Sequence, residues 1–98
     1  MKRPFIDSHV HFWDPQHLGY EWLAEVPRIH SPFLLGDLVR HAGDLSLEEV
    51  VFVQADCIPE DAMLEVEWVT ALAREEPWIR GIVAFAPLEE GVAVRGWL

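Results

Sequence analysis

Two histidines, His9 and His11, are the residues of this chain whose type and spacing best suit chemistry. They follow a short apolar segment, and side chains two residues apart in a strand point to one face, with Cβ atoms about 6–7 Å apart. Two imidazoles placed in this way can bind one divalent metal ion at about 2.0–2.1 Å and leave room for further ligands. Asp7 shares their face, whereas Ser8 and Val10 point the other way. The spacing also arises by chance, so a ligand role and a purely structural role both remain open.

Polar and aromatic side chains elsewhere are candidates for the wall of a substrate pocket. Gln54 and Asp56 close the second apolar segment, where polar side chains either line a pocket or satisfy loop amides. The tryptophans Trp13 and Trp22 either form part of the pocket wall or pack the long loop in which they lie. From these residues we select Trp13 and Gln54 as the expected substrate contacts. The single cysteine, Cys57, is expected to be a buried spectator, because no histidine lies close in sequence to activate it.

The remaining titratable residues are expected to lie mainly on the surface. His17, His30 and His41 have no partner at the spacing that is typical of metal ligands. The acidic residues between Glu60 and Glu76 are expected to form mainly the solvated face of a helix.

Three short apolar segments, residues 4–9, 50–55 and 81–86, are predicted to be strands. The second is continuously apolar rather than alternating, and it is rich in β-branched residues. Continuous apolar strands of this length are typical of a parallel sheet that is covered on both faces. Active sites of parallel α/β barrels lie at the carboxyl ends of the strands, which is where His9 and His11 stand on the first segment.

A helix over residues 60–76 is predicted between the second and third strands. Pro59 and the acidic residues after it suit the first turn of a helix, and Pro77 ends it. At about 100° per residue, one stripe of this helix is apolar, with further apolar residues beside the stripe. The stripe contains Ala62, Val66, Val69 and Ala73, and the residues beside it are Leu64, Trp68 and Leu72.

The connection between the first and second strands is less regular. Residues 12–35 form a long segment rich in aromatic residues, which is more typical of a functional loop than of a linker. A short helix is expected at residues 37–42, ended by Gly43 in a left-handed conformation. Residues 46–49 are expected to form a further capped turn. The order is therefore strand, loop, helix, strand, helix, strand, which includes one βαβ unit.

These segments, in this order, resemble a known family. Residues Asp7 to His11 resemble the signature of the amidohydrolase superfamily, an aspartate followed by His-x-His at the end of the first barrel strand. The continuation through Pro15, and then Tyr20 to Leu23, is similar to the branch called amidohydrolase 2, whose namesake is the sugar lactonase fuconolactonase. His-x-His alone is a weak signal, whereas the ordered set of segments is a strong one. Further similarity, which extends over nearly the whole chain from residue 5, lies in residues 51–55, 67–73 and 79–83.

The resemblance implies an α/β fold, the N-terminal part of an eight-stranded (β/α) TIM barrel with a parallel sheet. About three βα units are expected, within a domain over residues 4–98 that is incomplete on its C-terminal side, since a complete barrel needs about 250 residues. Two positions depart from the family pattern. The segment from Asp44 to Glu49 is longer and more acidic than a tight turn, and Pro87 stands where relatives often carry a polar residue.

The resemblance also implies an activity, the hydrolysis of a lactone of a sugar or small organic acid. In such enzymes the first-strand histidines, here His9 and His11, bind one divalent metal ion of the zinc type or, in metal-independent members, the substrate. The other family ligands and the catalytic base come from strands outside this chain, so no catalytic residue is assigned within it. Two alternatives stay open: a decarboxylase of the same superfamily, and an inactive truncated fragment without a catalytic role.

Composition bears on the partners. The chain has 17 acidic and 7 basic residues and a net charge of −10, which disfavours nucleic acid and anionic membranes as partners. Its apolar segments are far shorter than the ~20 residues that span a bilayer, and one cysteine permits no internal disulfide. We therefore expect a cytoplasmic protein. The resemblance implies that its partner is a small lactone or related cyclic molecule, and self-association is a further expectation.

Overall fold

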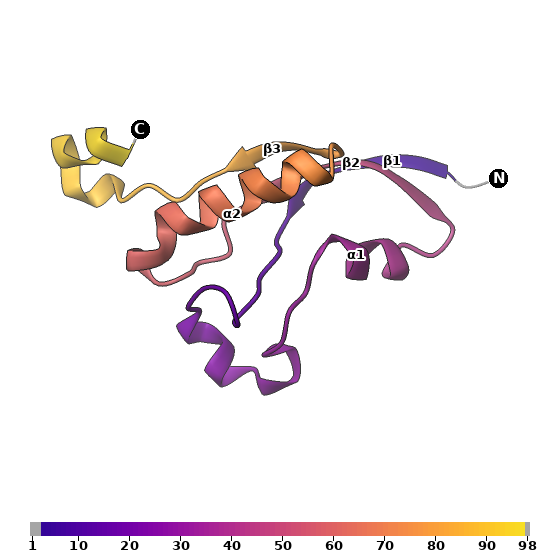
Figure 1. Cartoon of the computed structure of the whole chain (residues 1–98), viewed down its shortest axis with the longest axis horizontal. Coiled ribbons are helices and arrows are strands. Elements are labelled where there is room, and N and C mark those ends of the chain that lie inside the picture. The colour runs from indigo at the N-terminus through magenta and orange to yellow at the C-terminus, as the bar shows by residue number, and fades with distance from the viewer. Residues whose placement is uncertain (1–2, 98) are drawn as a thin grey trace.

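A three-stranded parallel sheet forms the frame of the chain in the computed structural model, which describes residues 3–97 (Figure 1). The strands are β1 (Arg3–Val10), β2 (Leu45–Val53) and β3 (Ile79–Val83), and β2 lies in the centre. Both pairings are parallel, which confirms the prediction for the three segments. Leu98, the last residue of the expected domain, lies outside the described residues.

The central strand begins earlier than predicted. Residues 46–49, expected to form a capped turn, belong to β2 and pair with the first half of β1, as in the pairs Arg3–Leu45 and Phe5–Leu47. Leu45 and Leu47 alternate with polar neighbours, which is the pattern of a strand rather than of a turn. The prediction was therefore wrong here, because backbone pairing with β1 extends the strand beyond its continuously apolar part.

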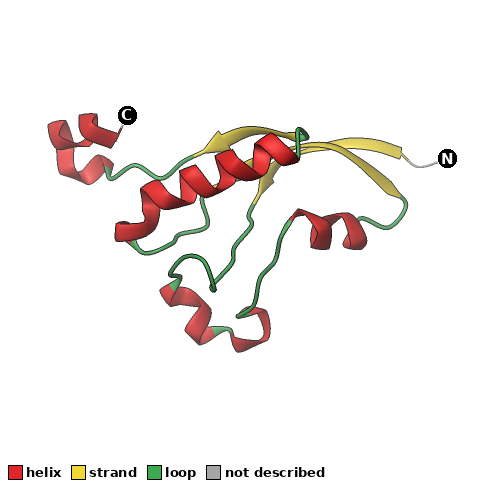
Figure 2. Cartoon of the chain, viewed as in Figure 1, coloured by secondary structure: helices red, strands yellow, loops and turns green. Residues whose placement is uncertain are grey.

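Helices connect successive strands, as Figure 2 shows. The helix α1 (Leu35–His41) precedes β2, and α2 (Ala62–Glu75) lies between β2 and β3, as predicted. Shorter 3-10 segments are η1 (Glu21–Glu25), η2 (Pro27–Ile29), η3 (Pro59–Asp61) and η4 (Leu88–Trp97). Across the described residues, no helix has both the length and the apolar character that a membrane crossing requires.

Both α-helices pack on the same face of the sheet, as the right-handed crossover rule predicts. The buried residues of this core come from the strands, from α1 and α2 and from the start of the long loop; they are Val10, Phe12, Leu35, Val50, Phe52, Val69 and Ile79. Phe52 lies in this core at 0% exposure.

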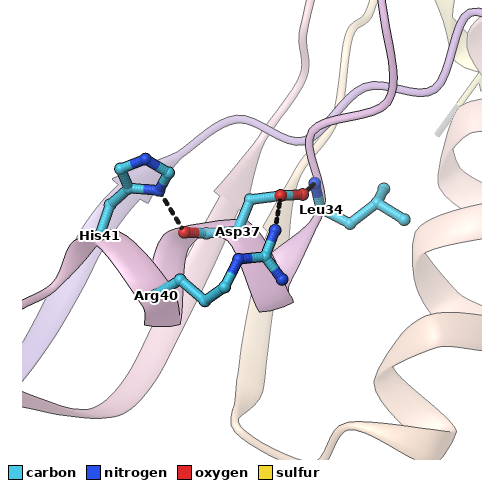
Figure 3. Close-up of polar contacts among 4 residues, drawn as sticks. All are labelled: Leu34, Asp37, Arg40 and His41. Atoms are coloured by element: carbon cyan, nitrogen blue, oxygen red, sulfur yellow. Dashed lines mark hydrogen bonds and ion pairs between the residues drawn. The ribbon is translucent and has the colours of Figure 1, made fainter.

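Local hydrogen bonds fix the ends of α1 (Figure 3). The Asp37 carboxylate accepts a hydrogen bond of 2.8 Å from the Leu34 amide and pairs with the Arg40 guanidinium. At the other end, Nδ1 of His41 donates to the carbonyl oxygen of Asp37 at 2.8 Å. Gly43 follows with a φ of 63°, which confirms the left-handed helix end that the sequence predicts.

The long loop after β1 is an ordered layer of its own. Trp13 and Phe33 join its two ends in a short antiparallel bridge, with backbone hydrogen bonds of 3.1 and 2.9 Å. Within the loop, the Gly19 amide donates to the Asp61 carboxylate at 2.7 Å. A Cβ at Gly19 would come within 2.9 Å of the Ile58 side chain, so a glycine permits this close approach. The loop is thereby fixed against η3 and against the end of β2.

Candidate functional site

His9 and His11 converge at the carboxyl end of β1. Their Nε2 atoms lie 3.2 Å apart, and the two rings meet edge-on with centroids 4.9 Å apart. Both side chains are exposed rather than packed in the core. The prediction that they project from the same side of the strand is therefore confirmed, and the geometry is one in which two nitrogen atoms can act on one ligand.

A hydrogen bond to β2 sets the orientation of the His11 ring. Its Nδ1 lies 2.9 Å from the carbonyl oxygen of Val53. Since a carbonyl can only accept, Nδ1 must carry the proton, and in neutral imidazole Nε2 then presents a lone pair toward His9. A bond from the second ring nitrogen to a carbonyl is the usual way in which a metal-binding histidine is oriented.

Asp7, which the spacing places on the face of the two histidines, is bonded to the backbone. Its Oδ1 accepts a hydrogen bond of 3.1 Å from the amide of His9. The carboxylate therefore holds the local course of the strand that carries the first imidazole. Within residues 3–97, no group of three histidine, cysteine or acidic side chains lies close enough to hold a metal ion.

A cavity of about 360 Å³ opens beside His11, at the ends of β1 and β2. Two of its six lining residues, Trp13 and Gln54, are those that the sequence predicts as substrate contacts. Two more, Trp22 and Asp56, are candidates from the sequence for the wall of a pocket. The full set is His11, Trp13, Trp22, Gln54, Ala55 and Asp56.

The two tryptophans in this wall are held by their indole N–H groups. Trp13 Nε1 donates to the carbonyl of Ile29 at 3.1 Å, and Trp22 Nε1 donates to the carbonyl of Ala55 at 2.9 Å. Their rings meet edge-on with centroids 5.4 Å apart. These residues therefore pack the loop and also line the cavity. With the N–H groups engaged, the rings offer mainly their carbon surfaces to a ligand.

The end of β2 makes a tight turn below the cavity. The Gln54 side-chain oxygen accepts a hydrogen bond of 2.7 Å from the Asp56 amide, so it satisfies a loop amide while the residue also lines the cavity. Asp56 has a φ of 55°, in the left-handed region that non-glycine residues rarely adopt. Such backbone strain is often found at functional sites.

Glu65 is a buried residue of the site region that the sequence prediction missed. Its side chain is 1% exposed, and its Oε2 accepts a hydrogen bond of 3.2 Å from the Ala55 amide. Burial raises the pKa of its carboxyl, although the Ala55 hydrogen bond and the His11 charge oppose this effect. The prediction that the acids of this helix lie in solvent was wrong for Glu65. The available signal was its spacing, because Ala62, Glu65 and Val69 follow the i, i+3, i+7 pattern of one buried face.

The other titratable candidates behave as predicted. His17, His30 and His41 are all exposed. Cys57 is partly buried, and burial together with the nearby Glu65 and Asp61 charges raises the pKa of its thiol to about 12. Burial also raises the pKa of Tyr20, again with a contribution from Glu65. The thiol is therefore protonated at neutral pH, as expected of a spectator.

Comparisons with known proteins agree with this fold. The chain superposes on a solved structure, amidohydrolase 2 from Bifidobacterium longum subsp. infantis, with a TM-score of 0.77 and 26% identity over 89% of this chain. It is also 26% identical to the uncharacterized protein y4mH of Sinorhizobium fredii over 90 aligned positions, or 83% of this chain. A search of protein-family models found no match.

The two relatives are much longer than this chain, which spans 34% of the amidohydrolase 2 structure and 30% of y4mH. A parallel sheet with both helices on one face is the arrangement of consecutive βα units in a barrel. The chain thus has the fold of the N-terminal part of a TIM barrel, and its likeness to amidohydrolase 2 supports the amidohydrolase superfamily as its family.

Proposed function

We propose that the complete protein is a hydrolase that opens a lactone of a sugar or small organic acid, with His9 and His11 at the reacting centre. The observation that carries the proposal is the convergence of the two Nε2 atoms, 3.2 Å apart, beside a cavity at the carboxyl ends of the strands. Active sites of parallel barrels lie at this end. The likeness to amidohydrolase 2 supports the hydrolytic class.

The two imidazoles fit a zinc-type ion. Two nitrogen atoms that each lie ~2.0–2.1 Å from one tetrahedral ion are ~3.3–3.4 Å apart, close to the 3.2 Å found here. Two histidines do not complete such a site, so further ligands must come from elsewhere in the complete protein. A bound divalent ion would polarise the lactone carbonyl and activate water. In a metal-independent enzyme the same nitrogen atoms would bind the carbonyl oxygen directly.

The residues of the cavity have separate roles in this proposal. His11, oriented by Val53, presents Nε2 to the ion or to the substrate. Trp13 and Trp22 bind the carbon face of the substrate ring, because their polar N–H groups are already engaged. The amide nitrogen of Gln54 can donate to a ring substituent, because its side-chain oxygen is bonded to Asp56.

The test combines metal analysis with assays of lactone opening on the complete protein. We expect His9→Ala and His11→Ala each to lower kcat/KM by at least ~100-fold, because loss of a metal ligand or a carbonyl donor removes transition-state stabilisation. If the protein binds a metal, both variants should also lose it. His30→Ala, which changes an exposed histidine that does not line the cavity, should match the parent protein.

Two outcomes would contradict the proposal. Lactone turnover that survives both substitutions would place the reacting centre elsewhere. Release of carbon dioxide from a carboxylated substrate, with no opening of any lactone, would favour the decarboxylase alternative.

A further inference from the structure

We propose that Glu65 is a positioning residue that holds the floor of the cavity from the helix side of the sheet, by fixing the Ala55 peptide. The Glu65 side chain is buried at the start of α2 and does not line the cavity, but it accepts a hydrogen bond from Ala55, which does. The expected effect of Glu65 on substrate binding rests on the function proposed above, whereas its expected effect on the Ala55 amide is independent of that function.

The Ala55 peptide is held on both sides. Its N–H donates to Glu65 Oε2 at 3.2 Å, and its carbonyl accepts from Trp22 Nε1 at 2.9 Å. Ala55 itself is 5% exposed, so neither group can rely on bulk water for a replacement partner. A continuous series of contacts therefore runs from α2 through the end of β2 to the aromatic wall, where Trp22 meets Trp13.

The residue after this peptide carries backbone strain. Asp56 adopts a φ of 55°, and a strained non-glycine residue keeps such a conformation only where its surroundings determine it. Its amide is bonded to the Gln54 side chain, while the preceding amide is bonded to Glu65. The two hydrogen bonds together fix the turn from which Gln54 and Asp56 reach the cavity.

Burying a carboxylate at this position costs free energy unless the carboxylate accepts hydrogen bonds. Neither ion pair in the described part of the chain, Arg40–Asp37 or Arg80–Glu49, includes Glu65. The charges that act on this carboxylate are His11, which attracts it, and Asp56, which repels it. An apolar residue would avoid this cost, but it would leave the Ala55 amide without an acceptor.

The test measures hydrogen exchange, resolved to single amides, on the complete protein and on two variants at position 65. Glu65→Leu should make the Ala55 amide exchange at least ~10-fold faster, because it removes the acceptor of a buried donor. Glu65→Gln keeps an acceptor oxygen of the same reach and should stay within about threefold of the parent. The matched controls are Glu67→Leu and Glu67→Gln, which change an exposed acid on the same helix.

A role limited to stability would give a different result. In that case Glu65→Leu would accelerate exchange uniformly across α2 and the sheet and would lower the melting temperature in parallel. That result would contradict the proposal that Glu65 positions the Ala55 peptide. The same holds if the Ala55 amide exchanges at the parent rate in that variant, or if Glu65→Gln behaves like Glu65→Leu. Faster exchange confined to residues 54–57 and to η1, with the melting temperature retained, supports the proposal.

An activity measurement provides a second readout. With a lactone that the protein opens, Glu65→Leu should raise KM severalfold and change kcat less, because the lost hydrogen bond holds the Ala55 peptide, while the bond that orients the His11 ring, to Val53, is kept. Glu65→Gln should restore the parent KM. If no lactone is turned over by any form, the function proposed above fails, while the exchange result still decides the role of Glu65. Equal KM values for Glu65→Leu and the parent would contradict positioning of the cavity.

Discussion

At the residue scale, His11 and Cys57 follow the carboxyl ends of neighbouring strands, but their surroundings prepare them differently. The bond from Nδ1 of His11 to Val53 leaves a lone pair on Nε2, which lies 3.2 Å from Nε2 of His9. Around Cys57, burial and two carboxylates, Glu65 and Asp61, raise the pKa to about 12 and keep the thiol neutral. Only the thiolate is a nucleophile, so the surroundings of Cys57 disfavour a nucleophilic role for its thiol.

This difference predicts the rate at which Cys57 is alkylated. With a thiol pKa of about 12 instead of 9.0, the thiolate fraction at pH 8 falls, and iodoacetamide should react ~1,000-fold more slowly than with a free thiol. The rate should keep rising about tenfold per pH unit between pH 8 and pH 10, whereas that of a free thiol levels off above pH 9. Mass spectrometry at several pH values measures both. Alkylation of the native protein at the free-thiol rate would contradict the assignment of Cys57 as a spectator.

The shared face of the histidine pair could be predicted because it depends only on the spacing of two residues within one strand. A spacing of two in a strand fixes the shared face, whatever the rest of the fold does. Glu65 could not be assigned in the same way, since the hydrophobic pattern alone treats every acid as solvent-facing. Its burial depends on the Ala55 amide, which belongs to another element and needs an acceptor there. Gln54 is intermediate: its position at the end of the strand was predictable, but its bond to Asp56 was not.

At the element scale, the order of strands and helices was predictable, while several boundaries were not. Pro59 and Pro77 flank the second helix. A proline favours the start or the end of a helix through its own fixed φ and missing N–H, so these two signals do not depend on the rest of the fold. The early start of β2 depends instead on pairing with β1, which lies some forty residues away in the sequence. The same dependence explains β3, which was predicted at 81–86 but occupies Ile79–Val83, where it pairs with β2. Strand ends of this kind are set by a partner strand.

The helix α2 provides a direct test of which face is buried. The predicted stripe contained Val69 and placed Leu64 beside it, but Val69 is 0% exposed and Leu64 is 49% exposed. We expect Val69→Ala to lower the free energy of unfolding by ~2 kcal/mol, from lost burial and the cavity left behind. Leu64→Ala should lower the free energy of unfolding by no more than ~0.5–1 kcal/mol, since the site is exposed and alanine favours a helix. Denaturant unfolding of both variants measures the difference, and an equal or larger cost at Leu64 would mean that α2 is rotated from this arrangement.

At the scale of the whole molecule, the sheet has one covered face and two open edges. Both outer strands, β1 and β3, have an unpaired side in the described structure. Apolar side chains are exposed on these strands and on β2, among them Ile6 at 64%, Val83 at 52% and Leu45 at 43%. In a closed barrel, neighbouring strands and side chains from across the barrel cover such positions.

We expect the 98-residue chain by itself to lack measurable lactonase activity. The described residues bring together two imidazoles but no third ligand, and removing members of a catalytic set costs far more than a proportional share of the rate. Assays should compare the chain with a complete relative at equal concentration. Turnover by the isolated chain that disappears in His9→Ala and His11→Ala would contradict this prediction and would show that the three strands suffice.

The isolated chain should also associate, and the extent should depend on salt. Each apolar side chain that stays exposed loses ~1.5–3 kcal/mol of the free energy that burial would provide. Summed over several side chains, this loss is comparable with the free energy of unfolding of a typical domain, ~5–15 kcal/mol. Unpaired strand edges offer a second route, through backbone hydrogen bonds between copies. The net charge of −10 opposes both, and this repulsion is screened as the Debye length falls from ~30 Å at 0.01 M to ~8 Å at 0.15 M ionic strength. Sedimentation velocity should therefore show larger species at the higher ionic strength. A monodisperse monomer with a cooperative thermal transition under both conditions would mean instead that this sheet, with its covered face, is stable on its own.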